Sequence, residues 1–140
     1  NKYKGIHVAA HARLGDYHQW STFHTNLDKT DYYERAFSKY FPGIPREYLT
    51  ALVSDDSKQA ESLPPFSKFQ FVTDDLKLND IEDFCLLTLS KNLIIANSSF
   101  SAFAAILNKD VEKVVAPANW FQEDGPKQWD DLYMPNWEVI

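Results

Sequence analysis

The segment from His11 to Tyr17, with the sequence HARLGDY, brings together residue types that bind anions. Arg13 presents a planar cation that can hold a phosphate group through two parallel hydrogen bonds. His11 adds a titratable ring, and Gly15 lets the backbone approach a ligand closely because it has no side chain. An ordinary surface ion pair between Arg13 and Asp16 fits the same residues, so the segment predicts either a phosphate clamp or a polar loop.

A second polar segment, Asn97-Ser98-Ser99, follows one apolar run and precedes another. Backbone N–H groups at the start of a helix, together with serine hydroxyls, attract an anion. The simpler interpretation is that Ser98 or Ser99 only caps the helix. Arg13 and the start of this helix together predict a site that binds a diphosphate without a metal ion.

Three aspartates are further candidates. Asp55 and Asp56 follow an apolar run, and they fit a metal site, an acid–base pair or a pair of hydrogen-bond acceptors. A solvated turn before a helix explains them equally well, because carboxylates favour the positive end of the helix dipole. The same dipole explanation applies to Asp83, one turn into its expected helix. Three histidines have no convincing metal-ligand spacing and are expected to be ordinary core or surface residues: His7, His18 and His24.

The elements that must position these residues are short apolar runs separated by turns. Five runs are typical of strands: Lys4–Ala10, Tyr48–Ser54, Phe69–Val72, Leu93–Ala96 and Val111–Pro117. Four segments are expected to be helices: Tyr32–Phe41, Gln59–Leu63, Asp80–Lys91 and Phe100–Leu107. In the third helix the residues expected to face the core are Ile81, Phe84, Cys85, Leu87 and Leu89. The tryptophans of the tail are expected in the core, although sugar-stacking platforms or a cover for the sheet edge also fit: Trp120, Trp129 and Trp137.

Strands and helices alternate, and the strands are continuous apolar runs. This pattern predicts an α/β fold with a Rossmann-like parallel sheet and helices on both faces. Ligands of such folds bind outside the C-terminal ends of the strands. Each polar cluster lies at the end of an expected strand, which predicts one shared site: 11–16, 55–56, 74–75 and 97–101.

Length and composition exclude several classes. The chain has 140 residues, which suits a single domain over residues 1–140, and its formal net charge is 14 − 20 = −6. An acidic chain is a poor nucleic-acid binder, because duplex affinity depends on Lys and Arg. The lone Cys85 excludes an internal disulfide, and no apolar run approaches the ~20 residues of a membrane span. Because the sequence opens at Asn1, we expect a mature piece or a fragment of a longer protein.

The motifs and their order resemble a known family. The strings HARLGDY (11–17), VSDD (53–56) and IIANSSFS (94–101) follow one another, with Asp83 and Trp120-Phe121 at their expected places. From Ile6 to Ile140 the chain resembles the C-terminal half of an α1,2-fucosyltransferase of glycosyltransferase family 11. The resemblance implies two Rossmann-like domains, of which this chain supplies the nucleotide-sugar side. It also implies inverting transfer of fucose from GDP-β-L-fucose to a galactoside hydroxyl, with no cofactor and no metal.

The resemblance implies roles in catalysis for two residues. Arg13 would hold the β-phosphate and offset the charge of the leaving group. Asp16 is the motif carboxylate that we nominate as general base, unless the base belongs to an acceptor-side domain upstream or in another chain. The family usually has two adjacent arginines where this chain has Arg13-Leu14, and two tryptophans where it has Ala102-Phe103.

The resemblance also implies a donor-binding set. His11 and Asp83 would face the guanine end of the nucleotide. Ser99, with Ser98 and the nearby backbone, would bind the diphosphate, and Asp55-Asp56 match an acidic pair on which related fucosyltransferases depend. The full expected set is His11, Arg13, Gly15, Asp55, Asp56, Asp83, Asn97, Ser98, Ser99, Phe100 and Ser101.

Two other functions fit the sequence. A non-catalytic module would hold a GDP-sugar without transferring it, or would work only with a partner domain. A phosphoacceptor receiver domain would use Asp55-Asp56, but Lys113 and Pro117 lack the spacing that such a domain requires. One cysteine and no visible signal peptide favour a cytoplasmic location, or the Golgi lumen if the piece belongs to a membrane-anchored enzyme.

Overall fold

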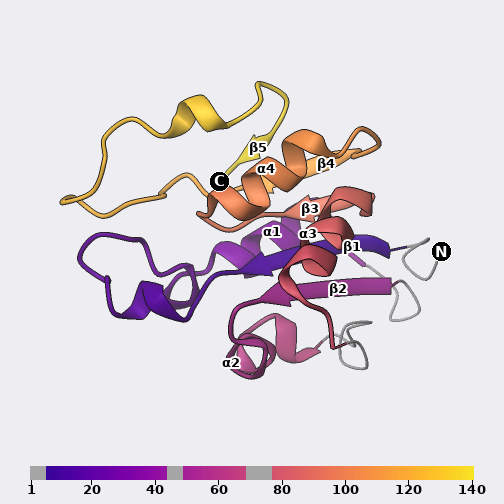
Figure 1. Ribbon diagram of the computed structural model, residues 1–140, viewed down its shortest axis with the longest axis horizontal. Coiled ribbons are helices and arrows are strands. Elements are labelled where there is room, and N and C mark those ends of the chain that lie inside the picture. The colour runs from indigo at the N-terminus through magenta and orange to yellow at the C-terminus, as the bar shows by residue number, and fades with distance from the viewer. Residues whose placement is uncertain (1–5, 44–48, 69–76) are drawn as a thin grey trace.

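The sheet is the organising element of the fold. The computed structural model describes residues 6–43, 49–68 and 77–140. Five parallel strands lie in the order β2-β1-β3-β4-β5 (Figure 1). Their bounds are β1 Ile6–Ala12, β2 Leu49–Ser54, β3 Asn92–Ile94, β4 Lys113–Ala116 and β5 Glu138–Val139. The predicted α/β class with a parallel sheet is therefore confirmed.

Helices cover both faces of the sheet (Figure 1). Within the described residues the α-helices are α1 Tyr32–Tyr40, α2 Ser57–Ser62, α3 Asp80–Leu89 and α4 Ser99–Leu107, and short 3-10 turns include η1 Asp16–His18 and η3 Phe66–Lys68. On one face, α1 and α2 pack against Val8 and Ala10 of β1. On the other face, α3 and α4 pack against Leu93 of β3 and Val114 of β4. The strands are continuous apolar runs because both of their faces are buried.

The strand bounds differ from the predicted ones in two informative places. The first strand continues to Ala12, so His11 belongs to the strand rather than to the loop after it. The fifth strand of the sheet, β5, is only two residues long and lies in the tail rich in Trp and Pro, where no strand was predicted. The predicted strand Phe69–Val72 and the cluster Asp74-Asp75 fall outside the described residues.

The predicted inward face of α3 is confirmed at Leu87, which is buried, and at Phe84, which packs against the core, but it is wrong at the other three positions. Ile81 and Leu89 are 75% and 56% exposed, and Cys85 is exposed as well. Leu86, which was not in the predicted set, fills the core beside Leu87. Apolar residues occur on every side of this helix, so helical spacing alone could not identify the side that packs.

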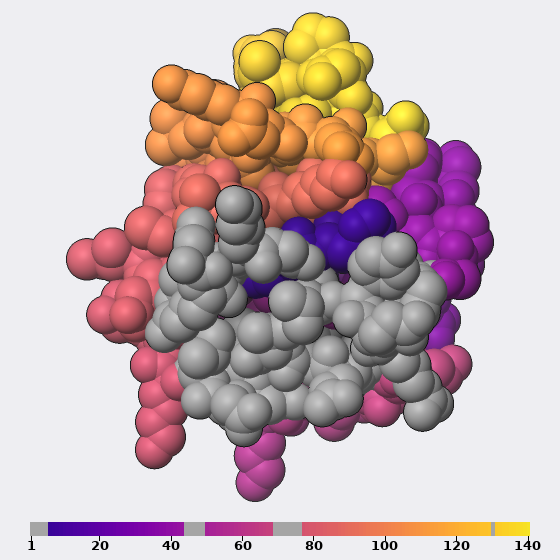
Figure 2. All heavy atoms as spheres, turned by 90° about the vertical axis from the view of Figure 1, so that its right-hand side faces the viewer, coloured from indigo at the N-terminus to yellow at the C-terminus, as the bar shows by residue number. Residues whose placement is uncertain are grey.

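The C-terminal tail adds strand β5 beside β4 and contributes tryptophans to the core. Trp120 and Trp137 are 4% and 8% exposed and belong to the core on the α3–α4 face, as expected, and Trp129 packs against it while partly buried. Figure 2 shows the side of the molecule at the right of Figure 1, with the C-terminal residues (yellow) uppermost above the segment of α4 and β4 (orange). In the described part of the chain, no helix has both the length and the apolar character needed to cross a bilayer.

Candidate functional site

The strand order places a topological switch point between β1 and β3. The chain passes from β1 to β2 on one side and then returns to place β3 on the other side of β1. At such a switch point the two following loops separate and leave room for a ligand at the C-terminal ends of the strands. The loop after β1 carries Arg13, and the turn after β3 carries Asn97, Ser98 and the start of α4. Two of the predicted clusters therefore meet at this point.

Asp55 holds the loop that carries Arg13. Its Oδ1 accepts the backbone N–H of Leu14 and its Oδ2 accepts that of Gly15, both at 2.8 Å. Oδ2 also lies 3.6 Å from Nε of Arg13. The side chain of Leu14 is 1% exposed and lies in the core on the α1 face, so this position does not line the site.

Arg13 and Asp16 form an ion pair at the surface. Nε and Nη2 of Arg13 lie 3.1 Å and 3.0 Å from Oδ1 of Asp16, and the side chains are 34% and 52% exposed. The hydrogen bond from Arg13 lowers the pKa of Asp16, which weakens this carboxylate as a base. Because exposed pairs contribute only ~0–1 kcal/mol, a phosphate group can displace Asp16 from Arg13 at little cost.

His11 is a buried neutral imidazole. It is 3% exposed, and its backbone carbonyl accepts the hydroxyl of Tyr33 from α1 at 2.8 Å. Burial lowers the pKa of His11 to about 4, against the raising effect of Asp55, and the charge of Arg13 lowers it further. Its Nδ1 is buried with no hydrogen-bond partner among the described residues, and its ring lies 5.5 Å from that of Phe100.

A small pocket of about 110 Å³ opens beside these residues. It is lined by His11, Arg13, Val53, Ser54, Asp55, Asp80, Asp83 and Phe100. Burial raises the pKa of Asp83, and the nearby charges of Asp80 and Glu82 raise it further. A capping box between Asn79 and Glu82 fixes the start of α3 and thus the place of Asp83. The pocket is lined by five residues of the predicted set, and Asp80 adds a carboxylate that is not in that set.

The remaining predicted residues lie at helix starts and turns. Asp56 caps α2 by accepting the N–H of Gln59, and Ser98 caps α4 by accepting that of Phe100. The amide of Asn97 is buried and donates to the carbonyls of Thr25 and Trp120. The hydroxyl of Ser101 is buried and accepts a hydrogen bond from the backbone N–H of Ala96. Ser99, in contrast, is exposed at the first position of α4.

Two residues near Arg13 were missed as site candidates. The Tyr17 ring lies 5.7 Å from the Arg13 guanidinium carbon, and its hydroxyl donates to the carbonyl of Asn97 at 2.8 Å. The imidazole of His24 stacks on Tyr17 at 4.1 Å with an angle of 7° between the rings. Tyr17 stands within the HARLGDY motif, but nothing in the sequence places His24 beside it.

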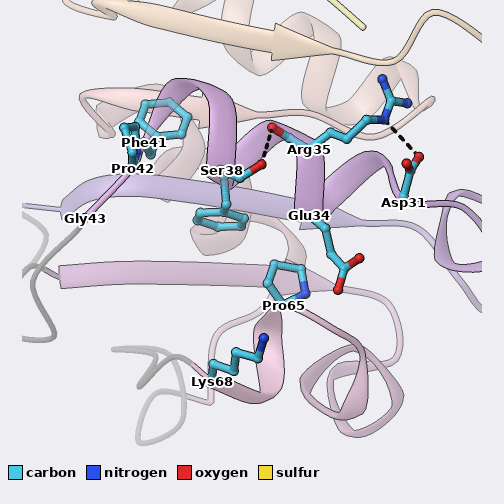
Figure 3. Close-up of a pocket in the computed structure, with 10 residues that line it drawn as sticks. Asp31, Glu34, Arg35, Ser38, Phe41, Pro42, Gly43, Pro65 and Lys68 are labelled. Atoms are coloured by element: carbon cyan, nitrogen blue, oxygen red, sulfur yellow. Dashed lines mark hydrogen bonds and ion pairs between the residues drawn. The ribbon is translucent and has the colours of Figure 1, made fainter.

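Another hollow, of about 450 Å³, lies between α1 and η3, away from these residues (Figure 3). It contains an ion pair between Arg35 and Asp31 at 2.8 Å and a hydrogen bond from Ser38 to the carbonyl of Arg35. No residue of the predicted site lines it. Across residues 6–43, 49–68 and 77–140, no group of three His, Cys, Asp or Glu side chains is arranged to hold a metal ion.

Comparison with known proteins agrees with the motifs. The family model described as Glycosyl transferase family 11 matches residues 2–140. The O-antigen biosynthesis glycosyltransferase WbnK of Escherichia coli is 34% identical over 135 residues, which are 93% of this chain and 43% of WbnK. The chain thus spans less than half the length of this curated relative, and no solved structure matches it significantly. With a family match over nearly all of its residues, the chain belongs to glycosyl transferase family 11.

Proposed function

We propose that the chain is the donor-binding part of a fucosyltransferase that moves fucose from GDP-β-L-fucose to a galactoside hydroxyl, with inversion and an α1,2 linkage. The observation that carries this proposal is that Arg13 follows β1 and the start of α4 follows β3, the two neighbouring strands at the switch point. A cation and a helix N-terminus at one switch point suit a diphosphate.

The diphosphate would lie between Arg13 and the first turn of α4. The exposed hydroxyl of Ser99 and the N–H groups of that turn supply hydrogen-bond donors. Arg13 would exchange its contact with Asp16 for two hydrogen bonds to a phosphate group. Asp55 would stay in place, because both of its oxygens already accept N–H groups of the loop.

The guanine base would enter the pocket beside His11. A volume of about 110 Å³ is below the ~300 Å³ of a complete small-ligand site, so it suits one end of a nucleotide. The carboxylate of Asp83 would accept the N1–H and N2–H groups of guanine. Phe100 and the neutral imidazole of His11 would supply the remaining contacts.

In the reaction, the oxygen of the acceptor hydroxyl attacks C1 of fucose and the bond from C1 to the phosphate oxygen breaks. The departing GDP takes the electron pair, and Arg13 with the start of α4 stabilises the negative charge where it develops. The proton of the hydroxyl passes to a general base. Asp16 could accept it only when free of Arg13, because their hydrogen bond keeps its pKa low. We propose that no metal ion is needed.

The competing function is a GDP-sugar-binding module without transferase activity of its own. The observation that favours it is the buried Leu14, which stands where the family usually has a second arginine and leaves the loop with one cation fewer. Calorimetric titration with GDP, combined with a transfer assay on a galactoside, separates the two functions. Binding with transfer supports the enzyme, binding without transfer supports the module, and no binding of GDP contradicts both.

A further inference from the structure

Two imidazoles flank Arg13 with unsatisfied nitrogens. Burial lowers the pKa of His11 and also that of His24, and the charge of Arg13 lowers both pKa values further. The charge of Asp55 raises the pKa of His11, and the charge of Asp16 raises that of His24, but neither outweighs the effect of burial. Nδ1 of each ring is buried and, within the described ranges, accepts or donates no hydrogen bond. A buried polar atom without a partner destabilises a protein unless a ligand or water pairs with it.

Along the order of the strands, the two rings lie on opposite sides of Arg13. The pocket at His11 follows β1 and β2, whereas His24 forms a bridge with Phe121, which follows β4. In the sheet order, β1 with Arg13 separates β2 from β3 and β4. The ring of Tyr17 connects the two regions, because its hydroxyl reaches the carbonyl of Asn97 while its face stacks on His24.

We propose that Tyr17 and His24 form the subsite for the transferred sugar, with the imidazole of His24 hydrogen-bonded to a sugar hydroxyl. The inference rests on the proposed function, because it takes Arg13 as the diphosphate site. If the base of a nucleotide fills the pocket at His11 and its diphosphate binds Arg13, the attached sugar must lie beyond Arg13, on the side away from that pocket. Tyr17 and His24 lie on that side.

The chemistry of this surface suits a hexose with an apolar face. An aromatic ring packs against the carbon-bound hydrogens of a hexose, and the exposed ring here is that of Phe23, because His24 already stacks on Tyr17. A neutral imidazole offers one hydrogen-bond donor and one acceptor. Phe23 packs edge-on against His24 at 5.0 Å and is 37% exposed, which extends the apolar surface outward. Trp20, in the same loop, is 61% exposed. The expected ligand is therefore a hexose with one apolar face, attached to the nucleotide diphosphate.

The variant His24→Phe tests the inference because it keeps a ring to stack on Tyr17 and removes the nitrogens. The wild-type chain, His24→Phe and the control Thr22→Ala are titrated with GDP and with GDP-β-L-fucose. Thr22 is exposed in the same loop. We expect His24→Phe to bind GDP within two-fold of wild type and GDP-fucose about five- to ten-fold more weakly, a loss typical of one hydrogen bond. Thr22→Ala should match wild type with both ligands.

The possible outcomes separate the subsite from the proposed function. If His24→Phe retains the wild-type affinity for GDP-fucose, or loses affinity for both ligands equally, the sugar subsite is contradicted while GDP binding stands. If the wild-type chain binds neither ligand, the proposed function fails and the subsite fails with it. GDP binding by each variant also reports that it is folded.

Discussion

Gly15 lies directly against the carboxylate of Asp55. Its N–H donates to Oδ2 at 2.8 Å, and a Cβ atom at position 15 would stand 2.6 Å from the same oxygen. A side chain at position 15 would therefore push the Asp55 carboxylate away from the two N–H groups, so glycine is favoured by the close approach rather than by its backbone angles. The contact fixes the loop after β1 and thereby the place of Arg13. Asp55 is thus a positioning residue for Arg13.

The variant Asp55→Asn tests this positioning role. An amide oxygen can accept only one of the two N–H groups, and its NH2 group faces the other. We expect a loss of ~1–3 kcal/mol in the free energy of unfolding and about ten-fold weaker GDP binding. Asp56→Asn is the matched control, because asparagine caps a helix as well as aspartate does. Equal behaviour of the two variants in urea unfolding and GDP titration would contradict the role given to Asp55.

Arg13→Ala should weaken GDP binding about ten-fold or more. Hydrogen bonds between a cation and a phosphate contribute ~1.5–3 kcal/mol. The control is Arg35→Ala, since Arg35 also forms an exposed ion pair, with Asp31, but lies outside the site. Calorimetric titration compares the two variants, and Arg13→Ala with wild-type affinity would make the HARLGDY segment a structural loop only.

Asp83→Asn should remove the preference for GDP over ADP. The amide keeps the shape of the carboxylate but turns a donor toward the N–H groups of guanine. Because Asp83 is partly buried beside Asp80 and Glu82, loss of its charge should leave the chain folded. Asp80→Asn lines the same pocket and serves as the control that keeps the preference. An unchanged GDP-to-ADP ratio in Asp83→Asn, with only a small shift in Tm, would assign base recognition to another residue.

The layers of this fold could be predicted from the sequence, but some of its details could not. Runs such as Leu93–Ala96 show strands buried on both faces, and the clusters 55–56 and 97–101 follow described strands as predicted. The two residues of β5 carry no periodicity, and their pairing with β4 depends on the path of the whole tail. Apolar residues lie on every side of α3, so its sequence could not separate the buried Leu86 and Leu87 from the exposed Ile81 and Leu89. That distinction depends on packing against α4.

The site could be predicted only where one segment holds several of its residues. Arg13, Gly15 and Asp16 lie in a single motif, so their proximity needed no tertiary information. The contact of Asp55 with Gly15 spans 40 residues, and its geometry depends on the pairing of β1 with β2. His24 reaches Tyr17 only because its loop bridges to Phe121 at the other end of the chain. Long-range contacts of this kind leave no local pattern.

The stability of the chain should fall between pH 6.5 and pH 4 because of His11. Burial holds the pKa of His11 at about 4, while in the unfolded chain it is near 6.5. Between these values the unfolded state binds a proton that the folded state does not, so the contribution is complete above pH 6.5 and is lost as the pH falls. The total loss is about 3 kcal/mol at pH 4.

The variant His11→Leu isolates this contribution, since it removes the titrating group and leaves all others. Urea unfolding of both proteins at pH 7 and pH 4.5 should show wild type losing about 2–3 kcal/mol more than the variant over that interval. Parallel losses in the two proteins would mean that His11 is protonated as readily in the folded state as in the unfolded state.

The most direct test of the proposed diphosphate site is to titrate GDP and GMP calorimetrically in the presence of a chelator and to compare their affinities. Arg13 and the start of α4 follow the neighbouring strands β1 and β3, and the proposed function assigns one diphosphate to both. We therefore predict that GDP binds at least ten-fold more tightly than GMP without any divalent cation. Equal affinities for the two nucleotides, or binding of GDP only after addition of Mg²⁺, would contradict the metal-free diphosphate site.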